Sequence, residues 1–497
     1  MSSCIRPADM IEKQDSSMSG HGLDCIFYPR SVAVVGVSSR AERLQGTGTI
    51  FLEGLLRSNF KGKIYPVNPR GGEILGLKVY PSIMDISEPV DYAICCISRL
   101  RVAPFIQECT MKGIKAVHVF ASGFSEIGTE EGKRQEEEIS FLARQSGIRI
   151  IGPNCLGPYC PESGLTYSSG FPREGGSIAF LSQSGAYCNY LIPAMAQRGV
   201  RFSKVLSYGN ACDVNECDLL EYFTADENTM VIAAYIEGVK DGERFKRVLR
   251  ETAEVKPVIV LKVGVAEAGA RAVTSHTGAL AGLDSVWDGF LRQAGAIRVH
   301  GLEELIDMVV TFSRLRLPPG RRTSVVGIGG GAAAVAADDC TNAGLTVPAF
   351  PIEVQNRLRQ LTVSGGIGMG LSNPVNLSDQ GWDILYDCAK VILDYDGIDL
   401  LIVQLPIRVF PSPYQDMMFP HIRELACAAV KAYNESSKSM SAVISNFLSS
   451  TQDCGVALEC EQIFCEAGLP VYHSLGNTAR AIARFLDYHV HKATGGR

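Results

Sequence analysis

The sequence predicts an α/β protein with three consecutive doubly wound layers, each a parallel sheet covered by helices. Short β-branched runs alternate with amphipathic stretches along the chain, an alternation that is typical of parallel sheets. The alternation breaks at residues 157–176 and again at 315–322, where Pro and Gly occur, and it restarts after each break. The length of 497 residues also exceeds what one hydrophobic core usually organises, so several domains are expected.

The first layer is expected to span residues 25–155. Residues 1–24 precede it as a loose polar arm without the apolar centre of a signal peptide. A surface helix is expected at 126–144, because one side of this stretch is charged while Ile139 and Leu142 fall on another. The strands of this layer are expected at its five β-branched runs, residues 31–38, 63–68, 90–97, 115–121 and 148–152.

The second and third layers are expected at residues 170–316 and 322–490. An apolar-striped helix is expected to end the third layer before His489. Open parallel sheets bind ligands at the carboxyl ends of their strands, so motifs at those ends are the candidates for chemistry. The strands are predicted at residues 177–182, 230–236 and 257–263 in the second layer, and at 323–329, 399–405 and 441–446 in the third.

Composition and charge argue against several functions. The formal net charge is -6 and no basic stripe is interleaved with aromatic residues, so nucleic acid is not an expected partner. No apolar run reaches the roughly 20 residues of a membrane-spanning helix. The 16 cysteines are scattered without CxxC spacing, which favours reduced, mostly buried thiols and a cytoplasmic location. Metal binding by Cys155 with Cys160, or by Cys212 with Cys217, is disfavoured because no histidine or second pair lies nearby.

The strand-end loops of the first layer form a candidate site for a nucleotide-like ligand. The turn after residue 35 precedes a helix expected to begin near 46–49, and a glycine there lets the backbone approach a phosphate at the helix start. Each loop alone is equally well explained as a simple turn, and the dinucleotide pattern G-x-G-x-x-G is absent here. Their placement at one sheet edge favours a shared ligand. The candidates are Gly36, Ser38, Asn68, Arg70, Ser98, Ser122, Gly123, Phe124 and Asn154.

A second candidate site begins at the end of the first strand of the second layer. The residues that follow this strand precede a helix expected at 187–198, and hydroxyls with a glycine at a helix start form an anion nest. One serine would suffice if the motif were only a helix cap. The residues of this expected nest are Ser182, Gln183, Ser184 and Gly185.

His276 is the candidate nucleophile. It lies between Ser275 and Thr277, ahead of the small residues 278–282, which are expected to open a helix from Gly278. If that helix start faces the one after Ser182, backbone N–H groups from both would hold a phosphoryl group on the imidazole. A carboxylate accepting the other ring N–H would fix the tautomer, and Glu237 at a strand end is the candidate. The alternative is an ordinary loop histidine.

From about Cys25 onward the chain resembles the alpha subunit of ADP-forming acetyl-CoA synthetases, in the succinyl-CoA synthetase superfamily. The resemblance is carried most specifically by residues 64–82, 147–157, 178–186, 218–223 and 275–282. It implies a Rossmann-like CoA-binding domain followed by two flavodoxin-like ligase domains. It also implies that His276 is phosphorylated and that Glu237 orients it. Tyr187 and Cys188 are the candidates for altering the acyl pocket relative to the acetyl enzymes.

The implied reaction joins a small carboxylic acid to coenzyme A with conversion of ATP to ADP and phosphate, through an acyl phosphate. The sequence contains no Walker A pattern and no recognisable ATP-grasp domain. The resemblance therefore implies a separate ATP-grasp beta subunit that brings the nucleotide and Mg²⁺, and hence a hetero-oligomer.

Two rival functions stay open at this stage. Residues 327–332 fit G-x-G-x-x-[GA] after a strand, as in a dinucleotide-dependent oxidoreductase, but no acidic residue ends the next strand near Val347. A packing role for these glycines is therefore preferred. The other rival is a regulatory subunit that binds CoA without catalysing the reaction, against which His276 and Glu237 together argue.

Overall fold

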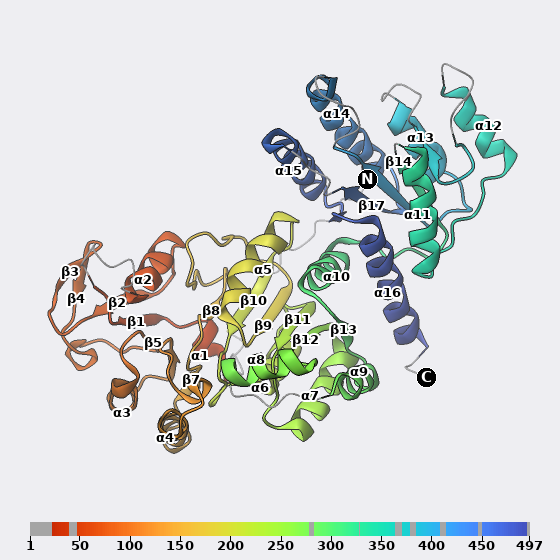
Figure 1. Ribbon diagram of the computed structural model, residues 1–497. Helices are drawn as coiled ribbons and strands as arrows, with labels where there is room; N and C mark the ends of the chain where they lie inside the picture. Colours follow the sequence, from red (N-terminus) through yellow and green to blue (C-terminus); the bar gives the residue numbers. More distant parts are fainter. Residues whose placement is uncertain are drawn as a thin grey trace, which may run out of the picture.

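The computed structural model describes residues 22–38, 47–277, 283–327, 329–362, 370–377, 384–407, 414–445 and 450–494; for Thr47, 274–277 and 414–418 it describes the backbone alone. Three sheets built mainly of parallel strands follow one another along the chain, from the red to the blue end of the colour scale in Figure 1. The α/β fold class predicted from the sequence is confirmed. No helix within these ranges is long and apolar enough to cross a lipid bilayer.

The first sheet has the order β2-β1-β5-β6-β7, and all its strands are parallel. Its two faces bury alternate residues, since Val32 and Val34 pack with α2 while Ala33 and Val35 pack toward α3 and α4. Its strands are β1 (Ser31–Val35), β2 (Lys63–Val67), β5 (Tyr92–Cys95), β6 (Ala116–Val119) and β7 (Arg149–Ile151), with a separate hairpin of β3 (Gly72–Ile74) and β4 (Leu77–Val79). Its helices are α1 (Asp24–Phe27), α2 (Thr47–Arg57), α3 (Val102–Lys112) and α4 (Glu130–Ser146), with short 3-10 turns η1 (Ile83–Asp85), η2 (Arg99–Arg101) and η3 (Ser125–Ile127).

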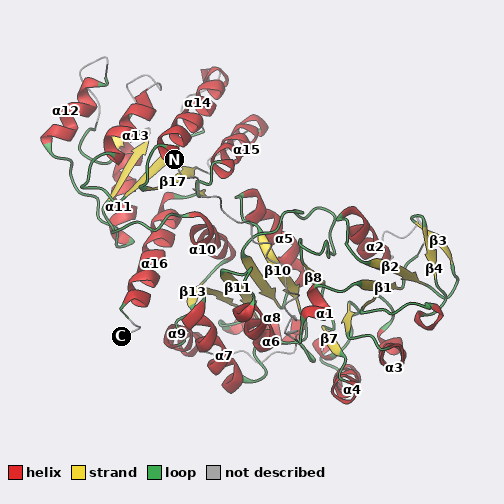
Figure 2. Cartoon of the chain, turned by 180° about the vertical axis from the view of Figure 1, so that it is seen from behind, coloured by secondary structure: helices red, strands yellow, loops and turns green. Residues whose placement is uncertain are grey.

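The second sheet has the order β13-β12-β11-β9-β10-β8, in which only β8 is antiparallel. Its strands are β8 (Gly157–Tyr159), β9 (Ile178–Ser182), β10 (Phe202–Ser207), β11 (Val231–Ile236), β12 (Val258–Lys262) and β13 (Ile297–Val299). Helices flank the sheet on both sides (Figure 2). They are α5 (Gly185–Gln197), α6 (Glu216–Ala225), α7 (Gly242–Val255), α8 (Glu267–Thr277), α9 (Asp284–Gln293) and α10 (Leu302–Arg314).

The third sheet has the order β15-β14-β16-β17-β18, again parallel. The last helix, α16, returns to pack against α10 and so joins the third layer to the second. The strands are β14 (Thr323–Gly327), β15 (Val375–Asn376), β16 (Leu400–Leu405), β17 (Ser439–Ile444) and β18 (Val471–Tyr472). The helices are α11 (Gly330–Asn342), α12 (Ile352–Gln360), α13 (Leu385–Leu393), α14 (Tyr414–Asn434), α15 (Thr451–Glu466) and α16 (Leu475–Ala493).

All three sheets share one strand order. Numbering the parallel strands of each sheet along the chain, with the β3–β4 hairpin set aside, gives the sequence 2-1-3-4-5 three times. This is the flavodoxin-like variant of the doubly wound plan, and its ligands bind where the winding direction reverses, between the first and third strands. The switch points are therefore at β1 and β5, at β9 and β11, and at β14 and β16.

Several predicted bounds are wrong for local reasons. Helix α4 begins at Glu130 instead of residue 126, because Thr129 caps it by accepting the Gly132 N–H at 3.1 Å. Helix α16 continues past His489 to Ala493. The break at 157–176 contains strand β8, which pairs with the unpredicted β10. Strand β10 was missed because Lys204 interrupts its apolar run, although this lysine is buried in an ion pair with Asp226 at 2.8 Å.

Candidate active site

The switch point of the second sheet brings two predicted site residues together. Gln183 follows β9 and Glu237 follows β11, and these strands are neighbours in the sheet. The side-chain Oε1 of Gln183 accepts hydrogen bonds from the backbone N–H groups of Glu237 and Gly238, the latter at 2.9 Å. Both side chains are buried, with Gln183 5% and Glu237 3% exposed. The two strand-end loops are thus fixed to each other.

The turn before α5 uses its two serine hydroxyls to hold its own shape. Ser184 caps the helix by accepting the Tyr187 N–H at 3.4 Å, while Ser182 Oγ accepts the Ser184 N–H at 3.1 Å and donates to the Ser184 carbonyl at 2.8 Å. A side chain at Gly185 would lie 2.8 Å from Leu156, so a glycine is needed at this close approach. The backbone at the start of α5, with its positive dipole end, is therefore the better candidate for binding an anion.

His276 lies in the last turn of α8, a helix that the sequence analysis did not predict. Alanines at 268, 270 and 272 favour continuation of the helix through this segment. The side chains of His276 and Thr277, and the whole of 278–282 with Gly278, lie outside what the structure describes. The backbone of α8 packs against η3 of the first layer. The helix that carries His276 thus lies next to the loop that follows β6.

Lys262, the last residue of β12, was not predicted. Its Nζ donates a hydrogen bond to the carbonyl oxygen of Glu237 at 2.7 Å, and its side chain is 3% exposed. The sequence did contain a signal for this residue, because an apolar run ends in Val-Leu-Lys and so puts a lysine at the end of a strand.

Three of the nine residues predicted to bind a nucleotide-like ligand line one cleft. Ser38, Asn68 and Arg70 share it with the β3–β4 hairpin, which the sequence did not predict. The amide of Asn68 braces the cleft, since its Nδ2 donates to the Val37 carbonyl at 2.6 Å and its Oδ1 accepts the Arg70 N–H at 3.0 Å. Gly36 adopts φ +94°, and a Cβ there would lie 2.4 Å from the Cys96 carbonyl oxygen, so a glycine is required.

The three predicted residues of the loop after β6, Ser122, Gly123 and Phe124, do not line this cleft. The backbone N–H groups of Gly123 and Phe124 both donate to the carboxylate of Glu126, the second at 3.0 Å, so they are already engaged. The Phe124 ring is fully buried in the core, where it cannot contact a ligand. Ser122 is exposed. Ser98 precedes η2 at the end of β5, and Asn154, with φ +59°, lies in the turn after β7.

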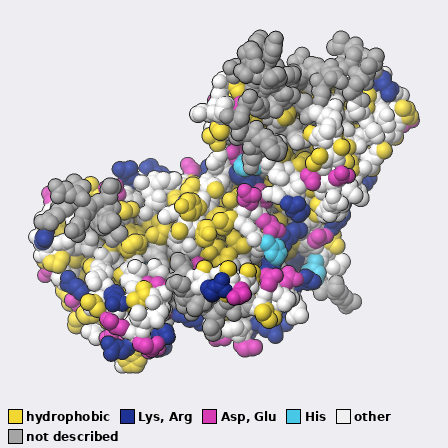
Figure 3. Space-filling model, viewed as in Figure 1, with side chains coloured by type: hydrophobic (Ala, Val, Ile, Leu, Met, Phe, Trp, Pro, Cys, Tyr) yellow, Lys and Arg dark blue, Asp and Glu magenta, His cyan; other side chains and the backbone are white. Residues whose placement is uncertain are grey.

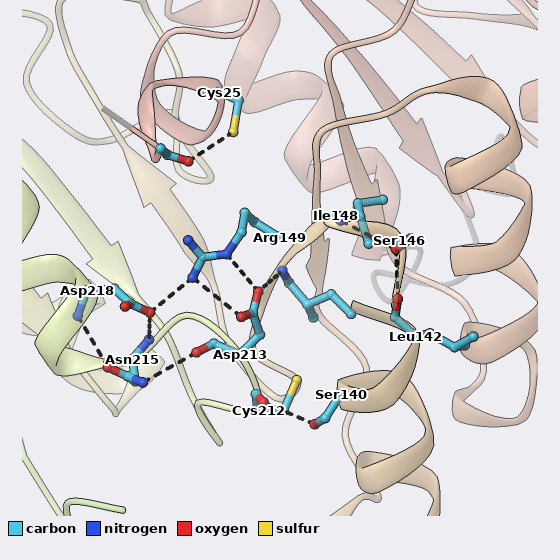
Figure 4. Close-up of polar contacts among 12 residues, drawn as sticks. Cys25, Ser140, Leu142, Ser146, Ile148, Arg149, Cys212, Asp213, Asn215 and Asp218 are labelled. Atoms are coloured by element: carbon cyan, nitrogen blue, oxygen red, sulfur yellow. Dashed lines mark hydrogen bonds and ion pairs between the residues drawn. The ribbon is translucent and has the colours of Figure 1, made fainter. Parts of the chain in front are cut away.

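Polar contacts that the sequence analysis did not predict hold the first layer against the second. Arg149 of β7 forms ion pairs with Asp213 and Asp218 at 3.0 Å, which Figure 4 shows reaching from the second layer. Asn210 is 2% exposed and donates to the carboxylates of Glu126 and Glu136 at 2.7 and 2.8 Å. The strand ends of the two layers are therefore held in a defined relation.

A cavity of 280 Å³ lies beside the start of α5, between the first two layers. Hydrophobic side chains gather on the face of the molecule that Figure 3 shows. Ile50, which lines the cavity, is 51% exposed, and Tyr190 of α5 is 71% exposed. Of the two residues expected to shape an acyl pocket, Cys188 is fully buried, and burial raises the pKa of its thiol to about 12; Tyr187 packs on Tyr235, with ring centroids 4.8 Å apart. Neither lines the cavity, whose walls are Ile50, Phe51, Glu53, Phe120, Leu156, Tyr167, Ser168, Ser169 and Asn189.

Comparison with known proteins gives two family matches. A CoA binding domain matches residues 30–161, and a succinyl-CoA ligase like flavodoxin domain matches residues 175–312. A CoA-binding domain followed by a ligase domain of this type defines the class of acyl-CoA ligases.

Individual relatives narrow the class. The chain is 33% identical to the alpha subunit of acetate–CoA ligase [ADP-forming] I from Pyrococcus furiosus, over 95% of this chain and 98% of that one. It is 36% identical to acetate–CoA ligase [ADP-forming] from Methanocaldococcus jannaschii over 71% of this chain, but spans only 49% of that longer protein. The chain belongs to the family of ADP-forming acetate–CoA ligases and corresponds to their alpha subunit.

A solved structure agrees with this assignment. The dinucleotide forming acetyl-coenzyme A synthetase 1 of Ca. Korarchaeum cryptofilum, in complex with phosphate and ADP, superimposes with a TM-score of 0.79. The two chains are 28% identical, and the match covers 95% of this chain and 97% of the other. The likeness therefore extends over all three layers.

Proposed function

We propose that this chain catalyses, with a partner subunit, the reversible joining of a carboxylic acid to coenzyme A at the expense of ATP, with His276 as the phosphoryl carrier. The observation that carries the proposal is the junction of Gln183 with Glu237 and Gly238 at the switch point of the second sheet. It sets a buried carboxylate beside the start of a helix, and an imidazole that accepts a phosphoryl group needs both.

The chemistry is simplest in the direction of acyl-CoA breakdown. An oxygen of phosphate attacks the thioester carbonyl, the C–S bond breaks, and CoA leaves as its thiolate while an acyl phosphate forms. A ring nitrogen of His276 then attacks phosphorus, the P–O bond to the acyl group breaks, and the carboxylate leaves. ADP finally takes the phosphoryl group. Glu237 would accept the other ring N–H and stabilise the imidazolium formed in transfer.

The domain division supports this sequence of steps. We propose that residues 25–155 bind CoA, with Ser38, Asn68 and Arg70 in the cleft beside the β3–β4 hairpin. Residues 170–316 would form the ligase domain with the phosphohistidine, and 322–490 a second one. Packing of α8 against η3 sets the His276 helix beside the first layer, where the thioester would be presented.

The partner is proposed to be an ATP-grasp beta subunit in a hetero-oligomer, because a matched relative is named as an alpha subunit. Mg²⁺ would accompany the nucleotide there and offset phosphate charge. A cytoplasmic location fits the many buried thiols, of which Cys95, Cys109, Cys155 and Cys188 are examples.

Incubation of the purified chain with acetyl-CoA and radiolabelled phosphate tests the proposal. Acid-labile label is expected on the protein, and His276→Ala should abolish it. His300→Ala, which changes an exposed histidine of the same layer, is the matched control and should keep the label. Label that persists in His276→Ala would refute the assignment. Absence of label in every variant, with the partner added and a series of acyl-CoA thioesters tried, would favour a regulatory CoA-binding subunit.

A further inference from the structure

Lys262 occupies a position that the proposed reaction does not yet use. It ends β12, directly beside the end of β11, where Ile236 is its register partner. Its ammonium group donates hydrogen bonds to two backbone carbonyls, that of Glu237 at 2.7 Å and that of Val263. The lysine is only 3% exposed. Burying its charge costs free energy, so its hydrogen bonds to main-chain oxygens point to a role for it at this position.

Together with Gln183, Lys262 holds the Glu237 loop from both sides. Gln183 accepts the N–H groups of Glu237 and Gly238, and Lys262 donates to the carbonyl of Glu237. Both polar groups of the Glu237 backbone thus have side-chain partners from neighbouring strands. The backbone that carries the carboxylate is therefore held on both sides.

The second carbonyl ties the same ammonium to the segment that leads to His276. Val263 and Gly264 lie in the connection from β12 to α8. Gly264 adopts φ +74°, and a Cβ added there would lie 2.7 Å from Val273 Cγ2 of that helix. The connection therefore packs closely under α8. Lys262 lies where the Glu237 loop and the base of the His276 helix meet.

The surroundings of the ammonium group are both apolar and charged. The ring of Trp287 lies 4.9 Å from Nζ. Burial lowers the pKa of Lys262 to about 8; Glu237 opposes this change, while Arg298 of β13 adds to it. Arg298 is itself paired with Asp284 and Asp288 of α9. These charged groups come from the strands on either side of β12 and from α9.

We propose that Lys262 is a positioning residue, which fixes the Glu237 loop against the base of the His276 helix and supplies buried positive charge when a phosphoryl group arrives. The inference rests on the proposed function, because it assigns a role within the same site. It predicts that phosphotransfer depends on the ammonium group although that group need not touch the substrate.

The test replaces Lys262 by Met and measures the rate of acid-labile labelling of His276 with acetyl-CoA and phosphate from pH 6.5 to 9.5. The rate should fall about ten-fold or more, as when an outer-shell partner is removed, with little change in the KM for acetyl-CoA. The wild-type rate should decline as pH rises through about 8, because the ammonium group loses its proton there. This decline of the labelling rate with rising pH should be absent in Lys262→Met.

Lys256→Met is the matched control. Lys256 precedes the same strand at its other end, is half-buried, and donates to the carbonyls of Phe223 and Asp226 at 2.7 and 2.6 Å. The Lys256→Met protein should lose stability as the Lys262→Met protein does, but it should keep the labelling rate and the pH profile of the wild type. If Lys262→Met does not fold, Lys262→Gln, which keeps a hydrogen-bond donor without charge, replaces it and should show the same loss of the alkaline step.

The outcomes separate the two proposals. A wild-type protein that takes no label, even with its partner subunit, would overturn the proposed function. A wild-type protein that takes label, with Lys262 variants that label at the same rate and with the same pH profile, would overturn the role of Lys262 alone.

Discussion

The second and third sheets have the same strand order, yet their switch points differ in chemistry. At β9 and β11 the strand-end loops are joined through Gln183 and the backbone of Glu237, with Lys262 beneath. At β14 and β16, a Cβ on Gly327 would lie 3.0 Å from Gln404. Gly329, which follows β14, donates to Asn376 of the neighbouring strand β15 at 2.8 Å. The described part of the third switch point is filled by close packing, while the second buries charge.

This difference shows that the shared strand order fixes where a site can form but not which side chains occupy it. A buried carboxylate and a buried ammonium group are costly, so they are retained where they do work. The packing around Gly327 agrees with the preferred role of the 327–332 glycines and offers no support for a dinucleotide site.

The largest effect is expected for Glu237→Gln. Loss of the carboxylate that orients His276 should lower labelling of the protein by about 100-fold or more, because the carboxylate fixes the tautomer of the imidazole and stabilises the imidazolium. Glu461→Gln is the control, since Glu461 is equally buried on the side of the third layer and binds Gln197 at 2.9 Å. This control should label like the wild type. Equal labelling by both variants would remove the distinction between the two regions.

A smaller effect, on stability, is expected when the side-chain acceptors are removed. Gln183→Ala leaves two buried N–H groups without this acceptor and should lower the free energy of unfolding by about 2 kcal/mol or more. Asn376→Ala removes the acceptor of one N–H group and should cost about 1 kcal/mol. Urea denaturation measures both changes. Only Gln183→Ala should also slow labelling; if Asn376→Ala slows it equally, the strand ends of the third sheet take part in the reaction.

The smallest effect concerns two carboxylates whose pKa values are shifted in opposite directions by the fold. Burial raises the pKa of Glu216, in the second layer, from 4.5 to about 7, so the folded state binds a proton that the unfolded state releases. Stability therefore falls as pH rises from 4.5 to 7. Glu216→Gln should raise the free energy of unfolding at pH 8 by about 1 kcal/mol and change it little at pH 4, as urea denaturation at the two pH values would show.

Asp399, in the third layer, provides the opposite case. Burial opposes ionisation, but hydrogen bonds from Arg322 hold the pKa of Asp399 below its usual value of 3.8. Its contribution is present above that value and is lost as pH falls further. Asp399→Asn should therefore destabilise the protein at pH 7 and much less at pH 2, as thermal unfolding at the two pH values would reveal. A variant of Glu216 or Asp399 with the reverse pH dependence would contradict the assignment.

Local pattern was enough for the parts of the protein that depend on neighbouring residues. The β-branched runs gave most strands, and the residues just after them included Gln183 and Glu237, because a strand end is visible in the sequence itself. Strand β10 was missed because its buried Lys204 is explained only by Asp226, which lies on another element. Helix α8, which carries His276, was not predicted, although the alanines at 268, 270 and 272 favour a helix.

By itself the sequence determined the repeated alternation of strands and helices, the α/β class and the candidate carboxylate and histidine. The tertiary structure decided which of these meet, since the order of strands in a sheet is a long-range property that local pattern does not contain. It joined Asn210 to Glu126 and Glu136 and set Lys262 under the Glu237 loop. Hydrogen bonds between residues far apart in the chain form only when the sheet has brought their strands together.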